Sequence, residues 1–222
     1  MSSPPTDKPR LDLTSAIVPA LAAALVAGVG TLFLVGRLPE APTPPPENCI
    51  LQGAEQVGGP ISLIDTHGSP VTQADFHEQP AILYFGYTHC PDVCPTTMYA
   101  LAQALGAPGG YDIQPVLITV DPRRDTPQVL GQYVRTNGFP AGLLGLTGAV
   151  AQVQAAEAAF RVYSHVQPVE GAPADAYNVD HTSFLYVMDS AWRTRAIINS
   201  AHATPSQIAQ CIAAGLDRRD RA

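Results

Sequence analysis

Lysine is almost absent from this sequence of 222 residues, because Lys8 is the only one. The 12 lysine and arginine side chains stand against 19 acidic ones, and the net charge is −7. Proteins that bind nucleic acid present a dense basic surface to the phosphates, and the arginines here are scattered along the chain. We therefore expect no nucleic-acid partner.

Cysteine is scarce as well, with four in the whole chain. That is too few for a disulfide scaffold at this length, so each cysteine has to be interpreted from its own surroundings. After the N-terminal features described next, about 175 residues remain, enough for one compact domain with a sizeable core. A second domain is not expected.

Charge is missing altogether from residues 16–36. As a helix rising about 1.5 Å per residue, this stretch matches a hydrocarbon core of about 30 Å. A cleaved signal peptide would have a shorter apolar region followed by a site of small residues. We expect a transmembrane anchor at 16–36 behind a cytoplasmic tail at 1–15, because Lys8 and Arg10 favour an N-terminus inside the cell.

A proline-rich stretch follows at residues 37–48. Such sequences adopt extended, semi-rigid geometry, so this stretch predicts a linker that holds the next part of the chain away from the bilayer. Residues 49–222 are then the folded domain. A bacterial inner membrane, with the domain on its periplasmic face, fits these features best.

Apolar runs and proline positions predict the order of elements in the domain. The first half should hold strands at 61–65, 81–87 and 115–120 and helices at 95–105 and from Thr126 to Gly138. In the second half we expect turns at 142–148, a helix at 149–162, a loop containing Pro168 and Pro173, a strand hairpin at 183–188 and 194–199, and a last helix opened by Thr204. Parallel strands crossed by helices and completed by an antiparallel hairpin describe an α/β, thioredoxin-like domain.

Cys90 and Cys94 follow the apolar strand directly and lie at the expected start of a helix. Side chains four residues apart share a helix face, so both sulfurs can point at one spot. Free N–H groups and the helix dipole at this end favour thiolate over thiol. The pair suits a soft metal, thiol–disulfide exchange or a plain disulfide, although thioredoxin-type oxidoreductases usually space their cysteines by two residues and not three.

His181 adds a third candidate ligand, because it stands just before the strand at 183–188, on a loop expected to lie against the cysteine turn. Two thiolates and an imidazole make a soft site of low coordination number, which suits copper, zinc or, for the thiolates, iron–sulfur chemistry. These three residues alone do not choose between the metals. Asp180 is expected to support the turn, not to bind metal.

Several neighbouring residues have simpler interpretations. Met98 lies one turn beyond Cys94 and is expected in the core, and the His89 side chain should diverge from the sulfurs. The segment from Asp121 to Asp125 should tighten a loop and cap the following helix, or alternatively face a partner protein. The remaining histidines are expected at the surface or in local hydrogen bonds, at positions 67, 77, 165 and 202.

Cys49 and Cys211 are the two cysteines left over, one just past the linker and one in the last predicted helix. In an oxidising compartment such a pair invites a disulfide, which would attach the start of the domain to its terminal helix. The sequence gives no distance between them, so the pairing stays open.

Three motifs in order resemble the Sco/SenC family of membrane-tethered copper chaperones. They are Gly-Tyr-Thr-His-Cys-Pro-Asp-Val-Cys-Pro at 86–95, Thr-Val-Asp-Pro-Arg-Arg-Asp-Thr-Pro at 119–127 and Val-Asp-His-Thr at 179–182. The resemblance implies that Cys90, Cys94 and His181 bind copper. It also implies a task, which is to help assemble the dinuclear copper site of cytochrome c oxidase subunit II.

The implied partners are that oxidase subunit, an external thiol reductant and a second copper carrier. On this interpretation the protein is a metallochaperone and not an enzyme. The alternative is a thiol–disulfide oxidoreductase that reduces the copper-site cysteines of the oxidase subunit. A peroxide-reducing enzyme on the same fold would explain neither the cysteine pair nor His181.

Overall fold

The computed structural model describes residues 44–107, 111–171, 173 and 176–216. The chain separates into two units, Met1–Pro44 and Pro45–Ala222. The predicted tail and the predicted anchor at 16–36 lie outside the described residues. None of the helices in the described part of the chain combines the length and the apolar character that a membrane crossing needs.

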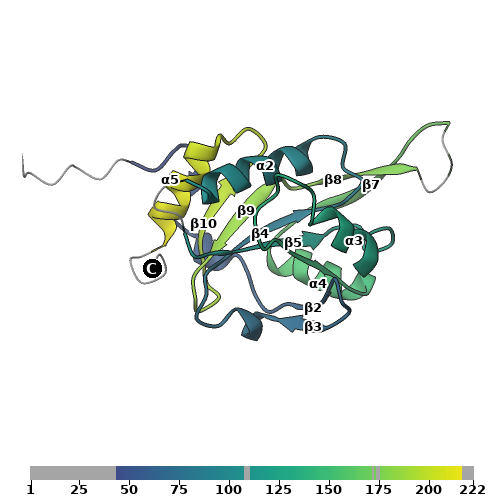
Figure 1. Cartoon of the computed structure of the whole chain (residues 1–222), viewed down its shortest axis with the longest axis horizontal. Helices are drawn as coiled ribbons and strands as arrows, with labels where there is room; N and C mark the ends of the chain where they lie inside the picture. The colour runs from purple at the N-terminus through teal and green to yellow at the C-terminus, as the bar shows by residue number, and fades with distance from the viewer. Residues whose placement is uncertain (1–43, 108–110, 172, 174–175, 217–222) are drawn as a thin grey trace, which may run out of the picture. The chain divides into compact units, whose positions relative to one another are not determined.

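An eight-stranded sheet forms the centre of the second unit, with the strand order β1-β10-β9-β4-β5-β6-β2-β3 (Figure 1). Its strands are β1 (Cys49–Ile50), β2 (Ser62–Asp65), β3 (Pro70–Thr72), β4 (Ala81–Gly86), β5 (Gln114–Thr119), β6 (Leu144–Thr147), β9 (Phe184–Met188) and β10 (Thr194–Asn199). The three central strands β4, β5 and β6 are parallel, and the other pairs are antiparallel. A separate two-stranded antiparallel sheet consists of β7 (Ser164–Pro168) and β8 (Tyr177–His181).

Helices cover both faces of the sheet because its central strand is apolar and every residue of β4 is buried. The helices are α2 (Val93–Leu105), α3 (Pro127–Tyr133), α4 (Val150–Ala159) and α5 (Pro205–Gly215), with short 3-10 turns η1 (Ala54–Gln56) and η2 (Gln73–Phe76). Helices α2 and α5 lie side by side on one face, and α4 lies on the other (Figure 1). On the α4 face, Phe85 packs against Phe160 with ring centroids 5.5 Å apart.

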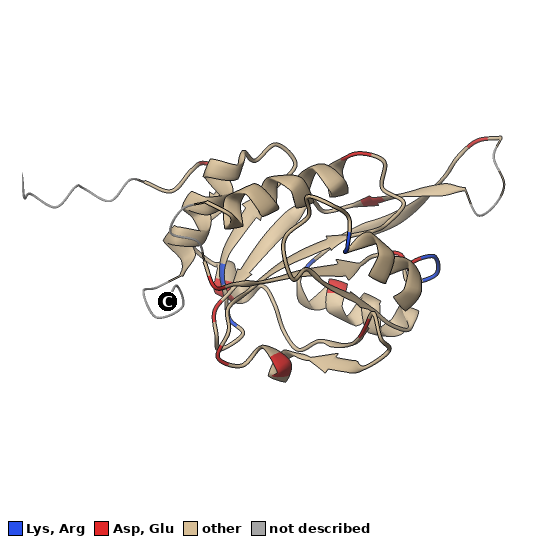
Figure 2. Cartoon of the chain, viewed as in Figure 1, with Lys and Arg blue, Asp and Glu red and all other residues tan. Residues whose placement is uncertain are grey.

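The predicted mixed α/β architecture is confirmed. The strands expected at 81–87, 115–120, 183–188 and 194–199 are β4, β5, β9 and β10, and the helix expected at 95–105 begins two residues earlier. Acidic residues are spread over loops, helical turns and strands, and basic ones are few and dispersed among the described residues (Figure 2).

Three local predictions were wrong. Residues 142–148 are not only turns, because β6 runs through them. Gly145 suggested a turn, but it lies in this strand. A Cβ at that position would come within 2.8 Å of Leu130, so the close packing of α3 on the strand explains why the residue is a glycine. Helix α3 ends at Tyr133 and does not reach Gly138. The predicted loop around Pro168 contains β7, and β8 follows it; both strands carry exposed polar residues and give a weak apolar signal.

Cys49 and Cys211 form a disulfide, which answers the question that the sequence left open. Their Cα atoms are 5.6 Å apart although 162 positions separate them in the chain. The bond joins β1, at the start of the folded unit, to α5. The start of the domain is thereby held against its last helix.

Candidate metal centre

The cysteine loop curls back onto the first turn of α2. Cys94 lies in that turn, and its backbone N–H donates to the Cys90 sulfur over 3.4 Å. Cys94 is fully buried and Cys90 is 8 % exposed, and both are free thiols. The two sulfurs therefore gather at the helix start, as the four-residue spacing predicts.

A buried carboxylate, Asp125, anchors the loop that leads to Cys90. It accepts hydrogen bonds from the Thr88 N–H at 3.0 Å and from the Thr88 and Thr119 hydroxyls, each at 2.6 Å. Helix α3 begins at the predicted residue, because the Thr126 hydroxyl accepts from the Val129 N–H and caps it; the expectation that the segment 121–125 supplies a cap was wrong. Burial raises the pKa of Asp125, and the hydrogen bonds from Thr119 and Thr88 oppose that shift.

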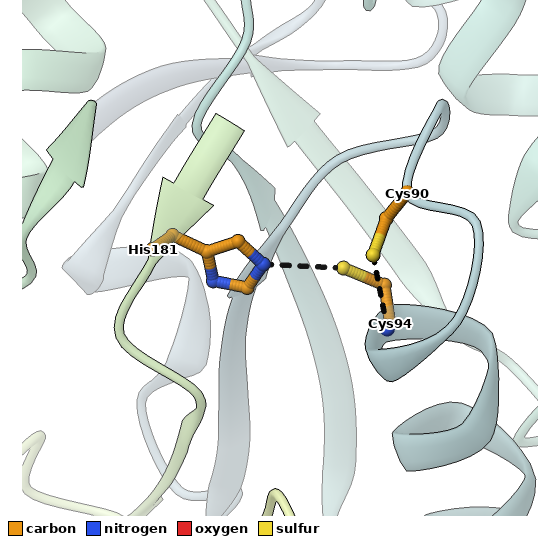
Figure 3. A group of neighbouring side chains, drawn as sticks. All are labelled: Cys90, Cys94 and His181. Atoms are coloured by element: carbon orange, nitrogen blue, oxygen red, sulfur yellow. Dashed lines mark hydrogen bonds between the residues drawn. The ribbon is translucent and has the colours of Figure 1, made fainter. Parts of the chain in front are cut away.

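His181 is the last residue of β8 and does not stand on a loop, so that detail of the prediction was wrong. Strand pairing places it opposite Ser164 of β7. Its Nε2 lies 3.3 Å from the Cys94 sulfur, and its Nδ1 lies 3.1 Å from the Thr182 carbonyl oxygen (Figure 3). When a metal is bound, a proton on Nδ1 would satisfy that carbonyl and leave the Nε2 lone pair for the ion.

The donor atoms of Cys90, Cys94 and His181 all lie within 4.8 Å of one another. Donors that share one ion through bonds of about 2.0–2.3 Å lie about 4 Å apart. Movements of less than about 1 Å would therefore bring all three onto one metal. A cavity of about 470 Å³, which Cys90 and His181 both line, gives access to this group.

The two thiols have opposite acidities. A hydrogen bond from Cys94 is the main cause that lowers the pKa of Cys90 to about 4; His181 adds to the effect and burial opposes it. Burial, followed by the hydrogen bond and the negative charge of Cys90, raises the pKa of Cys94 well above the ordinary range. At neutral pH the pair is one thiolate and one thiol, so a metal has to displace the Cys94 proton.

Two tyrosines hold the His181 ring between them. Tyr84 and Tyr87 meet the imidazole edge-on, with centroid distances of 6.0 and 5.8 Å. The Val179 N–H, two residues before His181, donates to the Tyr87 hydroxyl over 3.2 Å. These contacts leave the imidazole little freedom to turn away from the sulfurs.

An arginine clamp fixes β8 to the loop after β5. The Arg124 guanidinium lies 3.6 Å above the centre of the Tyr177 ring and donates to the Tyr177 carbonyl over 2.9 Å. Asp121 completes the clamp, because it pairs with Arg124 and accepts from the Tyr177 hydroxyl over 2.8 Å. Tyr177 opens the strand that His181 ends. Sequence reasoning found the tightened loop but not this role of Tyr177, for which the chain gives no local signal.

The other residues considered from the sequence make contacts of their own. Met98 is fully buried in the core, as predicted. His89 contacts Thr88 and Asp125. Asp180 is exposed and accepts from Gln167 over 2.9 Å. The remaining histidines are exposed, at positions 67, 77, 165 and 202.

The sequence of this chain is similar to those of known proteins. The chain matches the SCO1/SenC family over residues 51–217. It is 40 % identical over 164 residues to protein SenC of Rhodobacter capsulatus, a match covering 73 % of this chain and 72 % of that protein. It is 38 % identical over 140 residues to protein sco1 of Schizosaccharomyces pombe, covering 62 % of this chain but only 52 % of that protein.

A solved structure agrees with these matches. ScoI of Bradyrhizobium japonicum, with copper bound, superposes with a TM-score of 0.61 at 34 % identity, covering 72 % of this chain and 99 % of that one. The predicted thioredoxin-like fold is therefore the fold of the Sco proteins. The chain belongs to the SCO1/SenC family.

Proposed function

We propose that this protein is a copper metallochaperone that helps to assemble the dinuclear copper site of cytochrome c oxidase subunit II. The observation that carries the proposal is the meeting of two free thiols and an imidazole within 4.8 Å, in a chain of the SCO1/SenC family. Copper is the cargo, and ScoI of Bradyrhizobium japonicum holds the same metal.

The donor chemistry supports copper over its rivals. Thiolates and imidazole both suit copper, and copper stands highest in the general order of divalent metal affinities. Cys90 offers a thiolate in advance, Cys94 gives up its proton on binding, and His181 would supply Nε2. With three donors the ion keeps room for a ligand from a partner, and the cavity beside Cys90 lets that ligand approach. Delivery would then proceed by ligand exchange.

The cellular arrangement that we propose follows the sequence. A tail at 1–15 and an anchor at 16–36 would hold the chain in a bacterial inner membrane, and the linker at 37–48 would hold the domain of residues 49–222 off its periplasmic face. A common membrane raises the effective concentration of chaperone and oxidase subunit. Because that compartment oxidises thiols, an external reductant is needed, and a second copper carrier would supply the metal.

A deletion strain tests this function. Grown with little copper, it should lose oxidase activity and the dinuclear copper signal of the oxidase, and added copper should restore both in part. A strain that expresses the Cys90→Ala variant should behave like the deletion. Normal activity and a fully loaded copper site in the starved deletion strain would contradict the assigned role.

A second candidate is a thiol–disulfide oxidoreductase acting on the cysteines of the oxidase subunit, and the acidity of Cys90 favours it. The Cys90 thiolate would attack the target disulfide and release one target sulfur as a thiolate, leaving a mixed disulfide. Cys94 would then lose its proton and attack the Cys90 sulfur, so that the target leaves as a dithiol and a Cys90–Cys94 disulfide remains for the external reductant to reduce. The two functions differ in their need for His181. Metal delivery requires it as a ligand, whereas disulfide exchange should continue in the His181→Ala variant.

A further inference from the structure

Gly86 lies beneath the Cys94 sulfur, so no side chain fills the space between β4 and that sulfur. Tyr84 and Gly86 are two residues apart on β4, so they share the face that α2 covers. A Cβ on Gly86 would lie 2.7 Å from the Tyr84 ring and 3.1 Å from the Cys94 sulfur. The absence of a side chain at Gly86 is thus what lets the tyrosine ring and the sulfur approach each other.

Because of this space, the Tyr84 hydroxyl reaches the Cys94 sulfur. The side chain is fully buried, and its hydroxyl donates to the Cys94 sulfur over 3.7 Å. The hydroxyl has a single proton to give. The one Tyr84 proton is therefore directed at the sulfur.

We propose that Tyr84 is a positioning residue for Cys94 as a metal ligand, donating a hydrogen bond to the metal-bound thiolate across the space that Gly86 leaves open. The inference rests on the proposed copper-binding function. The Tyr84 ring also meets the His181 ring edge-on, with centroids 6.0 Å apart. Tyr84 therefore touches two of the three candidate ligands.

The contribution of this bond depends on the charge of the sulfur. Hydrogen bonds to an ionised acceptor are about twice as strong as neutral ones. A metal binds the thiolate and not the thiol, so in the copper-bound state the Tyr84 hydroxyl would meet an ionised sulfur. The bond from Tyr84 to Cys94 should therefore be of the stronger, charge-assisted kind when copper is bound.

The test compares the full chain in detergent micelles, reduced, as wild type and as Tyr84→Phe, with copper as the probe. Copper(I) affinity is measured by competition with a chromophoric chelator, and the thiolate-to-copper(II) charge-transfer band by absorption. Loss of a hydrogen bond around a ligand usually costs 10–100-fold in affinity, and we expect about tenfold. The band should move to longer wavelength, because the sulfur electrons rise in energy when the donated proton is removed.

Tyr186→Phe is the matched control. Tyr186 is buried like Tyr84, but it packs on the opposite face against Phe85 and Phe160. Its variant should keep both the affinity and the band position. A purely structural role of Tyr84 would lower the unfolding temperature and leave the band where it is, and that result would overturn the proposal.

Two further outcomes separate this inference from the proposed function. If the wild type shows the band and Tyr84→Phe matches it in position and affinity, the Tyr84 role is rejected and copper binding stands. If the wild type shows neither the thiolate-to-copper(II) band nor measurable copper(I) affinity, both fall. Gly86→Ala provides a second variant that keeps the hydroxyl but forces the ring and the sulfur apart. It should produce the same shift of the band, and an unmoved band would again reject the role.

Discussion

The acidity of Cys90 predicts how fast its thiol reacts at each pH. With a pKa of about 4, about 99 % of Cys90 is thiolate at pH 6, against about 0.3 % for an ordinary cysteine with a pKa near 8.5. Only the thiolate is nucleophilic. The rate of alkylation by iodoacetamide should therefore be constant from pH 5 to pH 8 and should fall only as the pH drops towards 4.

The height of that plateau is a weaker test than its shape. Intrinsic nucleophilicity falls by a factor of about 10 for every two units of pKa, so a thiolate of pKa 4 is about 100-fold less reactive than an ordinary one. Its roughly 300-fold larger thiolate population at pH 6 offsets most of this, leaving a rate about threefold above that of a free cysteine. Mass spectrometry of the reduced full chain, with circular dichroism to confirm folding, locates the label. Cys94, fully buried, should remain unlabelled.

The cause of the shift can be removed directly. The Cys94 hydrogen bond contributes most to the low pKa of Cys90, so Cys94→Ala should move the inflection of the rate profile upwards. His181→Ala should move it less, since the His181 hydrogen bond ranks behind that of Cys94. A wild-type rate that rises tenfold per pH unit up to pH 8 would refute the reasoning, as would an inflection unaffected by Cys94→Ala.

Three more predictions concern the fold, the clamp and the anchor. Replacing Cys49 and Cys211 with alanine should lower the free energy of unfolding in urea by up to about 5 kcal/mol, because the disulfide closes a loop with 162 positions between its ends; an unchanged unfolding midpoint would show that the bond does not constrain the unfolded chain. Arg124→Lys keeps the charge but loses the planar stack on Tyr177, so copper affinity should fall several-fold while the fold persists; full affinity would show that the clamp does not position the imidazole. Replacing residues 1–38 with a cleaved secretion signal should leave copper affinity intact and lower delivery to the oxidase, and equal delivery at equal protein level would reject the role of the tether.

Much of this molecule could be predicted because its signals are local. The apolar run of β4 followed by Cys90 and Cys94 specifies a buried strand, a turn and a helix start within a short stretch of chain. Thr126 and Thr204 mark helix starts through their own hydroxyls, which accept from N–H groups three residues on. The same locality explains why the four-residue spacing of the cysteines was enough to bring the sulfurs together.

The remainder depends on contacts between distant segments. The clamp joins Arg124 to Tyr177, which are 53 positions apart. The sequence around either residue does not indicate that the two are in contact. Gly145 resembles a turn residue until α3 is packed over it. The role of Gly86 likewise emerges only when the ring of Tyr84 and the sulfur of Cys94 lie above it. Prediction from sequence thus found the candidate ligands but not the residues that support them.

The most direct test of the account is the coordination of copper in the reduced full-length protein. X-ray absorption at the copper edge should show two sulfur neighbours and one imidazole nitrogen at about one copper per chain. The His181→Ala variant should lose the imidazole contribution and bind copper more weakly while remaining folded. Copper bound without sulfur neighbours, or the same spectrum and affinity in the His181→Ala variant, would contradict the claim that Cys90, Cys94 and His181 form the copper site.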